Sequence, residues 1–300
     1  MSSTVRRASH AGSWYAKDGR MLHGQLEEWL QAALASNIKH APARAIIAPH
    51  AGYAYSGPCA AFAYGQINPT AVKRIFLLGP SHHVSLDGCA LTTVKQYETP
   101  LYNIPIDVET TEKLKATGKF QEMSIKMDEE EHSLEMHLPY IAKVMESRQG
   151  LYSLVPILVG QLSSKKEEEY GVMFSEYLAD SSNLFIISSD FCHWGKRFSY
   201  TYANPEWGEI HESIQKLDKM GMDIIERIDA KEFRAYLKQY GNTICGRNPI
   251  SVFLSTLETF RKTAANSKIS LKFVQYTQSS PCRKNTDSSV SYASASLTMK

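Results

Sequence analysis

The sequence has few cysteines and lacks long apolar runs. Its five cysteines are an odd number, lie far apart and include no C-x-x-C pair, which argues against a disulfide framework. The first residues, Met-Ser-Ser-Thr-Val-Arg-Arg-Ala, contain no apolar stretch of signal-peptide length, and no later run approaches a membrane span. The sequence therefore predicts a cytoplasmic protein, with the nucleus left open as a second location.

The sequence also lacks an excess of charge of one sign. Lys and Arg number 33 against 31 Asp and Glu, so the net charge is +2, and no basic run is interleaved with aromatic residues. This balance argues against nucleic acid as a partner. The 300 residues include 43% hydrophobic and 21% charged residues, as in an ordinary globular protein. Since no low-complexity linker interrupts them, we expect a single domain over residues 1–300.

Apolar runs rich in β-branched residues alternate with amphipathic stretches. This alternation favours βαβ units, and the continuously apolar runs favour strands covered on both faces. The predicted strands are 44–49, 74–79, 89–94, 152–159, 184–189, 269–276 and 289–297. The predicted helices are 18–34, 56–67, 107–117, 130–146, 164–179, 207–227, 230–240 and 248–262. We therefore expect an α/β fold with a mostly parallel or mixed central sheet flanked by helices, and the last two strands as an antiparallel pair.

A charge run, Lys-Lys-Glu-Glu-Glu over 165–169, opens one of these helices. Ser163 or Ser164 is a suitable N-cap for it. Charge runs of this kind usually form a solvated helix face. We expect that arrangement here.

Polar side chains suited to metal binding or catalysis follow three of the predicted strands. His50 follows Ala-Ile-Ile-Ala-Pro, His82 follows Gly-Pro-Ser, and Asp190 and His193 follow Leu-Phe-Ile-Ile-Ser-Ser. In open α/β sheets, ligands bind beyond the carboxyl ends of the strands, where loops from several strands meet. We expect His82 to enter this cleft and its neighbour His83 to face away, because successive residues of an extended segment point to opposite sides.

The spacing of Asp190 and His193 allows two interpretations of the carboxylate. It could orient or ionise the His193 ring, as carboxylates do behind metal-binding histidines. It could instead cap the following turn. For His193 itself we expect a functional role, as a proton donor or acceptor.

Among the cysteines, Cys245 is the candidate for chemistry. It precedes an apolar helix and lies close to Arg247, two features that favour the thiolate form. Cys59 lies in an apolar helical stripe and is expected in the core. Glu131 and His132 begin a further helix and could line the cleft, but their spacing to His137 does not match a zinc helix.

Several motifs in fixed order resemble those of the Memo family, mediators of ErbB-driven cell motility. They cover nearly the whole chain and include Ala8-Ser-His-Ala-Gly-Ser-Trp14-Tyr, Ala48-Pro-His-Ala-Gly-Tyr, Gly79-Pro-Ser-His-His, Glu131-His-Ser-Leu-Glu-Met, Ser188-Ser-Asp-Phe-Cys-His-Trp and Asn242-Thr-Ile-Cys-Gly-Arg. That family is similar to the class III extradiol (LigB-type) dioxygenases, which implies a LigB-like fold.

The resemblance implies that His50, His82 and Cys245 bind a metal, either iron or copper, with zinc as a further candidate. Cys245 stands where the dioxygenases place a carboxylate ligand, and His193 stands at their acid/base histidine. A thiolate there softens the site and argues against classical ring cleavage. The resemblance also implies that Trp14, His50, His82 and His193 bind a phosphotyrosine receptor-tail peptide. It implies redox activity and a signalling role in cell motility and the cytoskeleton. The alternative is a metal-dependent oxidoreductase with its own small substrate.

Overall fold

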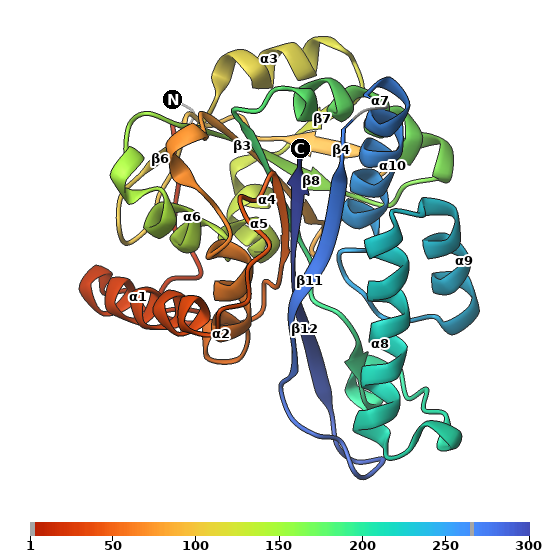
Figure 1. Ribbon diagram of the computed structural model, residues 1–300. Helices are drawn as coiled ribbons and strands as arrows, with labels where there is room; N and C mark the ends of the chain where they lie inside the picture. Colours follow the sequence, from red (N-terminus) through yellow and green to blue (C-terminus); the bar gives the residue numbers. More distant parts are fainter. Residues whose placement is uncertain (1–3, 265–266) are drawn as a thin grey trace.

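A computed structural model describes residues 4–264 and 267–300, with a mixed β-sheet running through the centre of the molecule (Figure 1). The strands of the central sheet lie in the order β10-β12-β2-β9-β3-β8-β4-β7, and β11 pairs with β12 beside this path. They are β2 (Ala45–Ala48), β3 (Arg74–Pro80), β4 (Cys89–Leu91), β7 (Phe120–Glu122), β8 (Ser153–Val159), β9 (Asn183–Ser188), β10 (His193–Trp194), β11 (Ile269–Gln278) and β12 (Ser289–Met299). A small separate sheet contains β1 (Val5–Arg6), β5 (Gln96–Tyr97) and β6 (Ile104–Pro105).

The four central strands are parallel and are flanked by antiparallel neighbours, β12 on one side and β4 on the other, whereas the edge strand β7 pairs in parallel with β4. Strand β9 pairs in parallel with both β2 and β3, and β3 pairs in parallel with β8. The final strands β11 and β12 pair antiparallel over their whole length, and β12 pairs antiparallel with β2. The expected α/β class, the mixed sheet and the antiparallel last pair are thus confirmed in one domain.

Apolar side chains of the central strands cover both faces of this sheet. In β3, Ile75 and Leu77 belong to one hydrophobic cluster, whereas Phe76 and Leu78 belong to the other. Side chains of a strand alternate between the two faces of its sheet, so one apolar run serves two cores. The helices of the two cores begin and end as follows: α1 (Gly19–Ala35), α2 (Tyr53–Tyr64) and α6 (Leu138–Val144) on the first face; α3 (Val108–Ala116), α7 (Ser164–Ala179), α8 (Ile210–Arg227), α9 (Ala230–Tyr240) and α10 (Arg247–Thr263) on the second.

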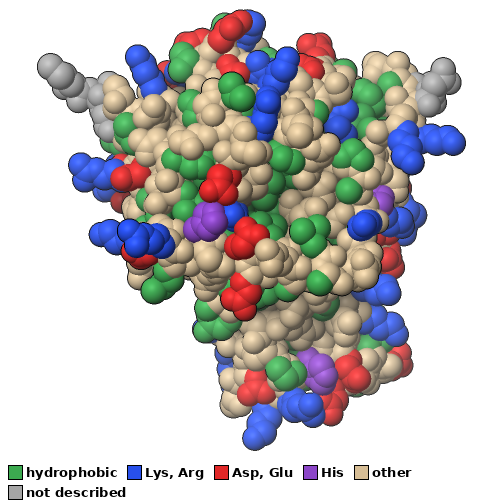
Figure 2. Space-filling view, turned by 60° about the vertical axis from the view of Figure 1, so that its left-hand side comes forward, with side chains coloured by type: hydrophobic (Ala, Val, Ile, Leu, Met, Phe, Trp, Pro, Cys, Tyr) green, Lys and Arg blue, Asp and Glu red, His purple; other side chains and the backbone are tan. Residues whose placement is uncertain are grey.

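The surface combines charges of both signs. On the face shown in Figure 2, Lys and Arg side chains are interspersed with Asp and Glu side chains. The hairpin end of β11 and β12 and the beginning of α8 extend below the rest of the molecule (Figure 1). No helix among the described residues has the length and apolar character needed to cross a membrane.

The predicted helix over 130–146 was wrong, because the chain breaks it into short pieces. The structure has α4 (Ile125–Glu130), α5 (His132–Glu135) and α6, followed by a 3-10 turn at Glu146–Arg148. Pro139 lies in the first turn of α6 and has no N–H to continue the α5 hydrogen-bond pattern. The side chain of Glu131 caps α5 by accepting from the Ser133 N–H. The break frees the start of α5 to face the cleft.

Helix α7 follows the prediction in its bounds and cap but not in its charges. The Ser163 hydroxyl accepts from the Lys166 N–H, as an N-cap does. Glu167, within the predicted solvated run, is buried and lies 2.9 Å from the Arg234 guanidinium. The solvated-face prediction therefore fails at Glu167, since a buried carboxylate requires a partner from another helix.

Close packing of α1 on α2 gives a first prediction. A Cβ at Gly57 of α2 would overlap the Trp29 indole of α1, whereas a Cβ at Gly24 of α1 meets nothing within 4 Å. We expect Gly57→Ala to lower the free energy of unfolding by about 1–3 kcal/mol through overpacking. Gly24→Ala, the matched control, should raise it by about 0.5–1 kcal/mol, because alanine is the better helix former. Urea unfolding measures both, and equal effects would contradict the packing argument.

Candidate metal centre and ligand cleft

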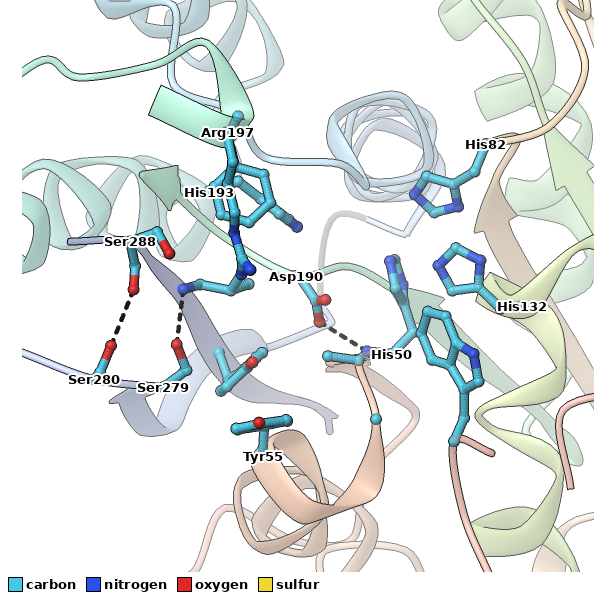
Figure 3. Close-up of a pocket in the computed structure, with 16 residues that line it drawn as sticks. His50, Tyr55, His82, His132, Asp190, His193, Arg197, Ser279, Ser280 and Ser288 are labelled. Carbon is cyan, nitrogen blue, oxygen red and sulfur yellow. Dashed lines mark hydrogen bonds between the residues drawn. The ribbon is translucent and has the colours of Figure 1, made fainter. Parts of the chain in front are cut away.

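A cleft of about 710 Å³ lies beyond the carboxyl ends of the central parallel strands. Five predicted site residues line it: Trp14, His50, His82, Asp190 and His193. Figure 3 shows His50, His82 and His132 together on one side of the cleft and His193 with Arg197 on the other, with Asp190 between them. The predicted meeting of the strand ends in one cleft is therefore what the structure shows for these residues.

Hydrogen bonds fix the tautomer of His50. Its Nδ1 lies 2.6 Å from the Ser188 hydroxyl, and that hydroxyl donates its only proton to the Ser133 carbonyl at 2.7 Å. His50 Nδ1 must therefore carry the proton and donate it to Ser188. Burial lowers the pKa of His50 well below its usual range. The ring is thus neutral, with the lone pair of Nε2 available to a ligand.

His82 is held in the same way by a carboxylate. Its backbone N–H donates to Glu131 Oε2 at 2.7 Å, and its Nδ1 lies 2.9 Å from Glu131 Oε1. Burial alone would raise the pKa of Glu131, but the His82 contacts overcome this and lower it to about 2. An ionised carboxylate fixes the proton on His82 Nδ1, which leaves Nε2 free. Hydrogen-bonded partners of this kind orient metal-binding histidines.

His132 is the imidazole whose place in the cleft the sequence left uncertain. Its ring stacks on that of His82, with centroids 4.4 Å apart. The centroid of the Trp14 ring lies 4.5 Å from that of His132. Burial and the neighbouring His82 lower the pKa of His132 to about 3. The rings of Trp14, His132 and His82 thus form a continuous aromatic wall. His83 was predicted to face away from the cleft and is absent from the described residues that line it, although its ring contacts His132.

Asp190 does not hold the His193 ring, so the orienting role predicted for it is wrong. Its Oδ1 accepts from the His50 backbone N–H at 2.8 Å. His193 Nδ1 instead lies 2.9 Å from the Phe191 carbonyl and 3.2 Å from the Thr243 carbonyl. Because carbonyls only accept, Nδ1 carries a proton, and in the neutral ring Nε2 keeps the lone pair. The Phe191 and Thr243 carbonyls thus orient the His193 ring, which is the role that the sequence analysis considered for the Asp190 carboxylate.

Cys245 lies behind His50 and is absent from the described residues that line the cleft. Its Sγ lies 3.1 Å from His50 Nε2 and accepts from the Asp190 N–H at 3.2 Å. Burial and the charge of Asp190 raise the pKa of the Cys245 thiol well above its usual range. The predicted preference for thiolate was therefore wrong for the metal-free protein. Cys59 is in the core as predicted, where burial raises its pKa to about 12.

Two sets of side chains in this region place ligand atoms within 4.8 Å of one another. One set is His50, His82 and His132, and the other is His50, Asp190 and Cys245. The predicted ligands His82 and Cys245 thus belong to different sets that share His50. In either set, a metal ion would depend on His50.

Known proteins resemble this chain over its full length. A family model described as Memo-like protein matches residues 6–296. Protein MEMO1 of Xenopus laevis is 56% identical over 295 residues, which cover 98% of each chain. Protein MEMO1 of Homo sapiens is 55% identical over 301 residues and all of both chains, and the Protein memo-1 homolog of Caenorhabditis elegans is 48% identical over 98% of this chain and 82% of its own.

The chain belongs to the Memo-like family. The family match runs from Arg6 in β1 to Ser296 in β12 and so includes every residue of the cleft described above. The resemblance inferred from the motifs is confirmed. Among solved structures, an uncharacterized protein from Escherichia coli K12 aligns with 84% of this chain and 99% of its own, at 10% identity and a TM-score of 0.46. That score is too low to bear on fold or function.

A buried charge network fixes the segment that carries Trp14. The Arg6 guanidinium is fully buried and lies 3.0 Å from Asp128 and 2.7 Å from Glu135. Glu135 also accepts from the Tyr15 hydroxyl and lies against His10 Nδ1, each at 2.7 Å. These bonds tie the chain on both sides of Trp14 to α5. The sequence motifs contain His10, Tyr15 and Glu135, but nothing local in them identifies these pairings.

Because of this network, the free energy of unfolding depends on pH in the acid range. Burial alone would raise the pKa of Glu135, but the His10 hydrogen bond and the Arg6 charge lower it to about 2. Its charged form is therefore stabilised by folding relative to an unfolded value near ~4.3. This stabilisation, on the order of 3 kcal/mol, is present above pH ~4.3 and is lost as pH falls toward about 2.

We therefore expect Glu135→Gln to destabilise the protein at pH 7 and the difference from wild type to shrink as pH falls from ~5 to ~2. Urea unfolding across that range tests this. Glu176→Gln, at an exposed position of α7, is the matched control and should follow the wild-type pH profile. A Glu135→Gln difference that stays constant with pH would refute the assignment of the ionised state.

Proposed function

We propose that the chain binds a redox-active metal, iron or copper with zinc as a further candidate, through His50, His82 and Cys245. The observation that carries this proposal is the hydrogen bonding behind the ligands. Ser188 and Glu131 fix the protons of His50 and His82 on Nδ1, so both Nε2 atoms are acceptors. The Cys245 sulfur lies against one of them. The donor set fits a borderline or soft transition metal.

A bound iron or copper ion would supply one-electron chemistry at this end of the cleft. The residues around it provide what such an ion needs from a protein. His50 is held neutral, the aromatic wall of Trp14 and His132 shields one side, and His193 presents Nε2 from the opposite side of the cleft. Since the buried Cys245 thiol resists ionisation alone, metal binding would release its proton. A thiolate ligand argues against classical ring cleavage, as the sequence analysis concluded.

We propose further that the cleft binds a phosphotyrosine-bearing receptor-tail peptide. Through this peptide the protein would relay receptor tyrosine kinase signals to cell motility and the cytoskeleton, in the cytoplasm, with the nucleus as a second location. The cleft offers the imidazoles of His50, His82 and His193 to a phosphate and the Trp14 ring to the tyrosine. The arginine that lines it is Arg197. Arg247 lines a separate, smaller cavity.

A metal-dependent oxidoreductase acting on a small substrate is the second candidate. It is favoured by the fixed tautomer of His193, whose free Nε2 suits a proton acceptor at the cleft. The resemblance to LigB-type dioxygenases supports the same candidate. Turnover of phenols or thiols that requires metal and is lost in His193→Gln would favour it. Peptide binding without turnover would favour the signalling role.

Metal binding is tested by titrating chelator-treated protein with Fe(II), Cu(I) and Zn(II). We expect His50→Ala to abolish most binding, because both ligand sets contain His50. Ser188→Ala should weaken it about 10- to 100-fold, since the His50 proton loses its acceptor. His23→Ala, on the outer helix α1, is the matched control and should bind as wild type does. Unchanged binding by His50→Ala would remove this residue from the site.

Peptide binding is tested by calorimetry with phosphorylated and unphosphorylated receptor-tail peptides. We expect only the phosphorylated peptide to bind, and Arg197→Gln to weaken it about tenfold, because a guanidinium–phosphate contact is lost. Arg247→Gln is the matched control and should have no effect. Saturating metal should weaken the peptide, and the peptide should weaken the metal equally, because both use His50 and His82. Equal binding of both peptides would leave the signalling role without a molecular basis.

A further inference from the structure

Cys245 lines a second, smaller cavity, which is distinct from the large cleft but shares His82 with it. Its volume is about 260 Å³, and it is formed by the loop after β3, the end of β8 and the start of α10. His82 lines both this small cavity and the cleft. Cys245 lines the small cavity and is missing from the described residues of the cleft, so Figure 3, which draws the cleft, does not include it.

The contact between His50 and Cys245 separates the two spaces. His50 lines the cleft and Cys245 lines the small cavity, and their Nε2 and Sγ atoms are 3.1 Å apart. A molecule in the cleft therefore meets imidazoles, whereas a molecule in the small cavity meets the sulfur and the other side of the His82 segment. The candidate centre is therefore bordered by two spaces, which share His82.

The small cavity has the charge and size for a small anion. Arg247 lines it, and among residues 4–264 and 267–300 this guanidinium has no carboxylate within ion-pair distance. None of the described residues lining the cavity is Asp or Glu. The nearby carboxylates of Glu131 and Asp190 are engaged by His82 and by the His50 N–H. The volume is below that of pockets for drug-sized ligands, which favours a ligand of only a few atoms.

We propose that this cavity is a second entrance to the centre, through which small anions of carboxylate size reach the Cys245 sulfur while the cleft is filled. Arg247 would attract the anion. Ser85, in the loop after β3, lines the cavity through which the anion would pass. The proposal goes beyond the proposed function, because it needs neither a bound metal nor a bound peptide. It assigns Arg247 to the small cavity and Arg197 to the cleft.

Two alkylating probes of similar size and different charge test this entrance on the metal-free full chain. In each reaction the Cys245 sulfur displaces iodide, an S–C bond forms, and the thiol proton passes to buffer. Iodoacetate is anionic and iodoacetamide is neutral, so the ratio of their rates at Cys245, measured by mass spectrometry, reports attraction of the anion. The ratio is independent of how much thiol is ionised, because both probes react with the same sulfur. The other four cysteines are buried and provide a low background.

We expect Arg247→Gln to lower the iodoacetate-to-iodoacetamide ratio at least about threefold, since a local charge raises the encounter rate of an oppositely charged ligand. Arg197→Gln, the matched control in the cleft, should leave the ratio unchanged. Ser85→Trp should slow both probes about tenfold or more by filling the small cavity. Ser280→Trp, at the exposed far end of the cleft, should slow neither.

The reverse pattern would overturn the proposal. If Arg197→Gln lowers the ratio or Ser280→Trp slows labelling, the sulfur is reached through the cleft. If Arg247→Gln leaves the ratio unchanged although Ser85→Trp blocks both probes, the cavity is an entrance without preference for anions, and the proposed ligand class is wrong. Melting temperatures of the four variants within a few degrees of wild type ensure that the comparison concerns access and not folding.

Discussion

Parallel pairing of three adjacent strands brings the centre together. Strand β9 lies between β2 and β3, with Ala48 opposite Ser188 and Leu78 opposite Ile187. Parallel strands end at the same edge, so the segments after them meet there whatever their separation in sequence. His50 follows β2, His82 follows β3, and Asp190 follows β9. A shift of one residue in either pairing would turn each strand's apolar side chains to the wrong core, so the two cores hold the register and thereby hold the site.

Hydrogen-bond direction then decides what the converging groups can do. A histidine can present either nitrogen, and its chemistry depends on which one carries the proton. Here the Nδ1 proton of each histidine is fixed by a group that can only accept a hydrogen bond from it. The Ser188 hydroxyl is committed to the Ser133 carbonyl, Glu131 is ionised, and the carbonyls near His193 can only accept. In the neutral rings each Nε2 therefore keeps a lone pair, and α5 with its N-cap residue Glu131 supplies two of the groups that fix the protons.

The features predicted from sequence are those that depend on local pattern. Apolar runs located β3, β8 and β9, and capping with amphipathic spacing located α7 and α9 within a residue or so of their bounds. What failed depends on distant partners. The two-residue strands β1, β5 and β6 exist only by pairing with each other, Glu167 is buried because Arg234 reaches it from another helix, and Asp190 is engaged by the His50 backbone. Residue spacing along the sequence cannot identify partners that lie so far apart in the chain.

The same distinction explains Cys245. Sequence proximity to Arg247 and to a helix start suggested a thiolate, but the fold leaves Cys245 only partly exposed and places its sulfur beside Asp190, whose charge opposes ionisation. Arg247 itself is exposed, so solvent weakens its influence on the sulfur while leaving it available to ions outside. One arginine therefore contributes little to the state of the thiol and more to what approaches it. Burial favours the protonated form of the sulfur, and His82 lines both the cleft and the small cavity in which the sulfur lies.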